Sequence, residues 1–179
     1  MTSYRDILSD ACRTGLDPVF GDLGFTCRRG LRWRRDSIEV RVVFDSKSGD
    51  PYRGGAFTLE FERSDNGQFE TKLAGRVRVD QLLDVSQRQW FLGLRNAVAA
   101  RLPRPDGVFL EAIPESLRDE YLKVFAPATQ LEPRPWMRFG DARDAREWCA
   151  LLGELMPVLV DRAGRVAPHV LLLGESLTW

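Results

Sequence analysis

The side chains that could do chemistry are few in this sequence and lie far apart. His169 is the one histidine among 179 residues, so a Ser–His–Asp triad or a multi-histidine metal site would have to include it. It lies in the apolar stretch APHVLLLGESLTW, and we predict that His169→Ala leaves any activity intact. Glu60 and Glu62 share one face of an alternating segment and could act as acid and base. Nearby arginines should hold both carboxylates ionised, so an acid with a raised pKa is not indicated.

Cysteine spacing and glycine motifs add no catalytic or metal site. Cys12, Cys27 and Cys149 are distant and odd in number, which argues against zinc spacing and against a disulfide framework. We expect buried free thiols in a reducing cytoplasm. The sequence has no P-loop, dinucleotide-binding, H-E-x-x-H, G-x-S-x-G or EF-hand pattern. We therefore predict no cofactor, no metal and no assignable catalytic residue. An enzyme that uses scattered carboxylates stays open as an alternative.

The charge pattern bears on nucleic-acid binding. Basic and acidic residues number 26 each, so the net charge is zero, whereas nucleic-acid binders usually show a basic excess. One local cluster, with Trp33 inside it, is similar to basic and aromatic nucleic-acid patches. Its members are Arg28, Arg29, Arg32, Arg34, Arg35 and Arg41. Alternation places Trp33 on the buried face, and glutamates on the next strand would repel phosphate. We expect no nucleic-acid partner, but a nucleic-acid-associated factor remains a second alternative.

Periodicity predicts helices on both sides of a group of strands. Strands are indicated by period-2 alternation around 31–34, 38–44 and 57–61, within 68–79, and at 137–139. Helices are indicated over 4–14, from Asp17 to Gly24, from a Ser86 cap to Pro103, after Pro114 and after Asp141. The helix after Pro114 carries Leu117, Tyr121 and Leu122 on one face. Pro157 should end or kink the last helix near Leu155. The prediction is a single α+β domain over 1–179, with one antiparallel sheet of three to five strands and helices packed on one face.

The first two strands can be paired residue by residue. If Asp36 and Ser37 form the loop, the facing pairs are Arg35 with Ile38, Arg34 with Glu39, Trp33 with Val40, Arg32 with Arg41, and Leu31 with Val42. The like-charge pair of Arg32 and Arg41 would cost stability unless an acidic residue lies nearby, and Glu60 and Glu62 are the natural candidates. The apolar face should bury Trp33, Val40, Val42, Leu59 and Phe61 against Trp90, Leu94 and Trp148.

The polar face of this sheet is the candidate interaction surface. It consists of Arg32, Arg34, Glu39, Arg41, Glu60 and Glu62. One interpretation is a solvated mosaic of ion pairs, each contributing about 0–1 kcal/mol. The other is a charged protein-binding surface, since arginine is enriched in interfaces.

The order of features resembles a bacterial family. A helical start leads into DLGFTCRRGLRWRR, two further alternating strands follow, and PWMRFGDARDAREWCALLGELMPVLV comes much later. This pattern resembles the DUF4304 group of uncharacterised bacterial proteins. The resemblance implies an α+β domain and carries no catalytic residues. Small domains of this kind often act as partners or immunity proteins beside toxin or defence genes.

These observations favour a non-enzymatic cytoplasmic protein-binding module, such as an immunity or accessory subunit. The N-terminal residues MTSYRDILSDACRTG lack the apolar core of a signal peptide, and no 18-residue apolar run predicts a membrane span. The partner should be another protein, and a homodimer is left open. The apolar run Val170–Leu173, with Leu177 and Trp179, is expected to pack on its own domain, with an interface to a second chain as the alternative.

Overall fold

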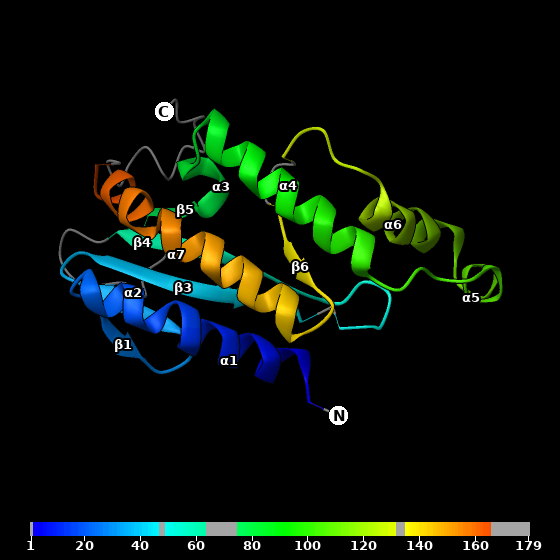
Figure 1. Ribbon diagram of the computed structural model, residues 1–179, viewed down its shortest axis with the longest axis horizontal. Coiled ribbons are helices and arrows are strands. Elements are labelled where there is room, and N and C mark those ends of the chain that lie inside the picture. Colours follow the sequence, from blue (N-terminus) through cyan, green and yellow to red (C-terminus); the bar gives the residue numbers. More distant parts are fainter. Residues whose placement is uncertain (1, 47–48, 64–74, 132–134, 166–179) are drawn as a thin grey trace.

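The computed structural model describes residues 2–46, 49–63, 75–131 and 135–165, which form one antiparallel sheet with helices over one face (Figure 1). The strands are β1 (Thr26–Arg28), β2 (Arg32–Arg35), β3 (Ile38–Phe44), β4 (Gly55–Arg63), β5 (Gly75–Arg78) and β6 (Met137–Phe139). The helices are α1 (Tyr4–Gly15), α2 (Asp17–Asp22), α3 (Val79–Leu82), α4 (Val85–Arg101), α5 (Gly107–Ala112), α6 (Glu115–Phe125) and α7 (Ala142–Arg165). The predicted α+β class is confirmed.

The sheet has six strands rather than three to five. Its order is β1-β2-β3-β4-β5, and β6 also pairs with β4. β5 pairs with Glu60–Arg63 of β4, whereas β6 pairs with Gly55–Phe57, so both short strands lie against β4. β6 confirms the extended piece expected at 137–139. β1 was not predicted, because three residues are too few to show a period of two.

The predicted hairpin register is confirmed. β2 and β3 pair Arg32 with Arg41, Trp33 with Val40, Arg34 with Glu39 and Arg35 with Ile38. Asp36 in the loop has φ +48°, a left-handed conformation that aspartate tolerates better than most residues do. β4 continues the register, because Val40 faces Phe61 and Val42 faces Leu59. Apolar side chains therefore share one face across three strands.

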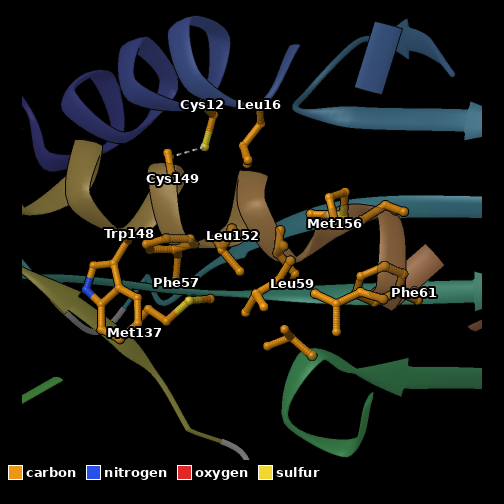
Figure 2. Close-up of a cluster of buried hydrophobic side chains, with 14 of the residues drawn as sticks. Cys12, Leu16, Phe57, Leu59, Phe61, Met137, Trp148, Cys149, Leu152 and Met156 are labelled. Carbon is orange, nitrogen blue, oxygen red and sulfur yellow. Dashed lines mark hydrogen bonds between the residues drawn. The ribbon is translucent and has the colours of Figure 1, made fainter. Parts of the chain in front are cut away.

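The core lies between this apolar face and α1, α2 and α7, with α7 crossing the sheet (Figures 1 and 2). Trp33, Val40, Leu59 and Phe61 are at most 1% exposed, as predicted, while Val42 is partly buried. Trp33 stacks on Phe20 with ring centroids 4.3 Å apart, and its Nε1 donates to Asp17 Oδ1 at 2.7 Å.

The predicted place of Trp90 in this core was wrong. Its side chain is 55% exposed, and the neighbouring Phe91 packs instead against Trp148, with ring centroids 5.3 Å apart. Leu94 packs against the core as predicted but is only partly buried. The reason is a shift in helix phase: α4 carries apolar residues on more than one side, so the period of its sequence does not decide which side turns inward.

Three helix predictions also need correction. α4 begins two residues earlier than expected, because Asp84 rather than Ser86 is the cap and exchanges hydrogen bonds with Gln87. In α6, Leu117 and Leu122 are exposed and only Tyr121 of the expected face is buried.

α7 passes through Pro157 and continues to Arg165, so the expected end near Leu155 is wrong, while the alternative of a kink there stays a prediction. A proline removes one intrahelical hydrogen bond, but buried residues on both sides of it hold this helix on the core. They are Leu152, Leu155, Met156, Leu159 and Val160. Among the described residues, no helix combines the length and apolar character needed to span a bilayer.

Candidate functional site

The six predicted surface residues lie together on the sheet face opposite the helices. The strand register aligns these six residues, together with Arg76 and Arg78, in two rows across the sheet. One row runs Arg34, Glu39, Glu62, Arg76, and the other runs Arg32, Arg41, Glu60, Arg78. We call these eight residues the charged face. Because alternate residues of a strand point to opposite faces, the same register that buries Trp33 and Phe61 places every one of these side chains outward.

Ion pairs connect neighbouring strands across the charged face. Arg34 donates from Nε and Nη2 to Glu39 Oε2, at 3.1 and 2.7 Å, and Arg32 Nη1 lies 4.0 Å from Glu39 Oε1. Arg41 donates from Nε at 2.9 Å and from Nη2 to one oxygen of Glu60. Glu39 beside Arg32 and Glu60 beside Arg41 therefore offset this like-charge pair. Of the two acids expected there, Glu60 is confirmed, whereas Glu62 accepts a hydrogen bond from Arg76 instead.

In the row that contains Arg34 and Arg76, carboxylates form the floor and arginines form the outer layer, whereas Glu60 and Arg41 in the other row are about equally exposed, at 18% and 20%. The side chains of Glu39 and Glu62 are 4% and 1% exposed, whereas those of Arg34 and Arg76 are 34% and 46% exposed. This differs from a mosaic of solvated pairs, in which both partners would be open to water. The difference arises because glutamate is shorter, and the long arginine side chains close over it.

The environment of Glu62 differs from the expectation that nearby arginines hold its carboxyl group ionised. Burial raises the pKa of its carboxyl group, and this outweighs the opposing effects of Arg76 and Arg41. Arg76 Nε donates to Glu62 Oε2 at 3.2 Å, while Oε1 is buried without a hydrogen-bond partner. Glu62 is therefore held closer to its protonated form than a surface glutamate is, although arginines surround it.

Sequence reasoning missed Arg76 and Arg78 because the register of their strand could not be assigned. The alternation of these two arginines around Val77 was the available signal. The guanidinium of Arg78 lies over the ring of Trp136, 5.3 Å from its centroid. Trp136 immediately precedes β6, so this contact joins the charged face to the edge strand.

A pocket of about 110 Å³ adjoins Trp136, between α4, the C-terminal end of α6 and β6. Its polar lining comes from Arg95, Gln130 and Arg138. Its apolar lining comes from Leu92, Ala99, Leu102, Val124, Ala128, Leu131, Pro135 and Trp136. No carboxylate is part of this lining. Sequence reasoning could not find the pocket, because three segments distant in the sequence build it and none carries a motif.

The cysteines differ in part from expectation. Cys12 and Cys149 are buried, with their Sγ atoms 3.8 Å apart where α1 crosses α7 (Figure 2). Their mutual hydrogen bond and burial raise the pKa of the Cys12 thiol. Cys27 is exposed rather than buried, because it lies in the edge strand β1. In the described part of the chain, no cluster of three or more histidine, cysteine or acidic side chains could hold a metal ion.

Two predictions concern residues outside those described. His169 and the apolar run Val170–Leu173 with Trp179 belong to 166–179, so both remain predictions.

Comparisons with protein-family models, with curated proteins and with solved structures found no match to this chain.

Proposed function

We propose that the protein is a non-enzymatic, cytoplasmic protein-binding module, an immunity or accessory subunit of a bacterial toxin or defence system, and that the charged face contacts its partner. The observation that carries this proposal is the layered arrangement of charge. Glu39 and Glu62 lie buried beneath arginines that are one-third to one-half exposed. Both rows continue across four strands, so the arginines form one broad surface.

Buried carboxylates make this surface suited to recognition. Each hydrogen bond to a fixed oxygen restricts the rotamers of an arginine before any partner arrives. Ordering a long side chain on binding costs about 0.5–1.5 kcal/mol, so a surface ordered in advance loses less on association. Arginine is also among the residues that dominate binding energy in protein interfaces.

The charge balance of the face indicates the kind of surface that would complement it. Five arginines and three glutamates leave an excess of two positive charges on the charged face. Arg34 and Arg76 cover Glu39 and Glu62, so a molecule that approaches this row meets guanidinium groups first. The complementary surface would carry aspartate and glutamate side chains, which guanidinium groups bind in bidentate geometry.

One observation favours an enzyme as the second candidate. Glu62, with its raised pKa, is the kind of acid that proton-transfer catalysis uses. Its position argues against that role, because Arg76 lies against it and the pocket beside Trp136 has no carboxylate in its lining. The binding role therefore fits the geometry better.

The proposal can be tested by tagging the protein in its native host and identifying what co-purifies. The matched pair of variants is Arg32→Ser/Arg76→Ser on the charged face, and Arg143→Ser/Arg165→Ser on α7. The α7 arginines are 66% and 71% exposed, so both variants remove two exposed positive charges. We expect one stoichiometric protein partner with the wild type and with the α7 variant, and its loss with the charged-face variant. Recovery of nucleic acid instead, or a partner retained equally by both variants, would contradict the proposal.

A further inference from the structure

Arg138 in β6 has an unusual environment for a charged side chain. It is partly buried and donates from Nη1 to the backbone carbonyl of Arg53 at 3.3 Å. Among the described residues, no carboxylate lies within ion-pair distance of it. Desolvation is the main influence that lowers its pKa, and the charges of Arg53 and Arg95 act in the same direction. The charges of Asp45 and Asp50 oppose this shift, less strongly than Arg53 favours it but more strongly than Arg95 does.

Such an arrangement leaves hydrogen-bond donors available to an anion. A guanidinium has five N–H donors, and one long hydrogen bond to a carbonyl leaves most of those of Arg138 without a partner in the described part of the chain. The buried carboxylates Glu39 and Asp144 are paired, since Glu39 accepts from Arg34 and Asp144 accepts from Arg101 at 2.8 Å. Arg138 has no such carboxylate partner among the described residues, and it lines the pocket beside Trp136.

The wall of this pocket is held in place without using Arg138. Arg95 Nη2 donates to the carbonyl of Lys123 at 3.1 Å, and the amide group of Asn96 exchanges hydrogen bonds of 3.0 Å with the backbone of Ala128. These contacts tie α4 to the end of α6 and to the segment after it. The pocket is therefore preformed, which favours binding of a small ligand.

Size and lining define the chemistry of the ligand. A dry cavity of about 150 Å³ holds benzene, so 110 Å³ accommodates about four or five non-hydrogen atoms. The apolar walls would leave a dianion such as phosphate poorly solvated, whereas a carboxylate can pair with one guanidinium in bidentate geometry. A short alkyl group attached to that carboxylate would contact Leu92, Leu131 and Val124.

We propose that the pocket beside Trp136 binds a carboxylate on a small apolar group, with Arg138 as its anchoring residue. This proposal is independent of the proposed protein-binding function, because it rests on Arg138 and not on the charged face. A free short-chain acid and the C-terminal carboxylate of a peptide share this chemistry.

Propionate is the direct probe, with the Nε–H resonance of Arg138 followed by NMR in the full chain. We expect a saturable shift of that resonance with a Kd near millimolar, and no matching shift with inorganic phosphate. Arg138→Met should weaken propionate binding at least tenfold, while Arg165→Met on α7 should leave it unchanged. Arg138→Met should also keep or raise the melting temperature, because it removes a desolvated charge that has no acid partner.

Two outcomes would overturn the proposal. One is the absence of a saturable shift up to about 0.1 M propionate, about a hundred times a Kd of 1 mM. The other is propionate binding that Arg138→Met leaves unchanged. The wild-type resonance decides the first outcome even where the variant folds poorly. If acetyl-Gly-Ala binds more tightly than propionate and its C-terminal amide does not bind, the carboxylate comes from a polypeptide.

Discussion

Removing Arg34 should destabilise the protein more than removing the charge of Glu39. The two groups form one ion pair, with distances of 3.1 and 2.7 Å to the same carboxylate oxygen. Their surroundings differ, because the side chain of Glu39 is 4% exposed and that of Arg34 is 34% exposed. The group left behind after each substitution therefore has a different access to water.

The magnitudes follow from that difference. Breaking a buried pair by removing one partner costs about 3–5 kcal/mol. Arg34→Met leaves Glu39 buried, but Arg32 Nη1 lies 4.0 Å from its other oxygen, so we expect a loss of about 2–3 kcal/mol. In Glu39→Gln the amide oxygen still accepts from Arg34, and Arg34 can turn to water, so we expect about 1 kcal/mol. Because Arg34 is partly exposed, the coupling energy of the double-mutant cycle should also be about 1 kcal/mol.

Urea unfolding at neutral pH and low salt measures all four proteins of this cycle. The expected order is wild type, Glu39→Gln, then Arg34→Met in decreasing stability. Equal losses in the two single variants, or a coupling energy below about 0.3 kcal/mol, would show that the buried carboxylate does not fix the arginine. That result would remove the physical basis for a surface ordered in advance.

Three further predictions concern other parts of the fold. The exposed Cys27 thiol should react with a thiol reagent in the native state, whereas Cys12 and Cys149 should react only after unfolding. Fast reaction of more than one thiol in the native protein would contradict the burial of Cys12 and Cys149. Because the pKa of Glu62 is raised in the folded state, ionisation of this carboxyl group opposes folding. The loss of stability is absent below the pKa of an unfolded glutamate and grows as the pH rises through the folded pKa. Glu62→Gln should flatten the dependence of stability on pH in that window, and an unchanged curve would contradict the shift. Gly55→Ala should lose about 2 kcal/mol or more in urea unfolding, because a Cβ there would lie 2.4 Å from the ring of Phe139, and an unchanged midpoint would show that the ring can move.

The alternation of residues decided how much of the fold could be predicted. Trp33, Val40 and Phe61 alternate with charged residues, and a period of two leaves only one register that buries all three. The charged face followed from the same register, so its six predicted members lie where the sequence placed them. Their layering could not be predicted, because the burial of Glu62 depends on how arginines from neighbouring strands fold over it.

Helix phase and long-range assembly were beyond sequence reasoning. Trp90 and Phe91 are adjacent aromatic residues, and only the position of Trp148 decides which one turns inward. The pocket beside Trp136 depends on Arg95 and Arg138, which lie in different elements with no shared pattern. Such sites arise from tertiary packing, which local propensity and spacing do not specify.

Affinity for the purified partner, compared between charged-face and α7 variants, tests the central claim most directly. Arg32→Ser/Arg76→Ser should weaken binding at least tenfold, since each lost guanidinium removes a charge-assisted contact and about 1.4 kcal/mol is a tenfold change in Kd. Arg143→Ser/Arg165→Ser should bind like the wild type, because these two side chains belong to α7 and not to the sheet. Equal affinities for the two variants would contradict the account and move the contact surface away from the charged face.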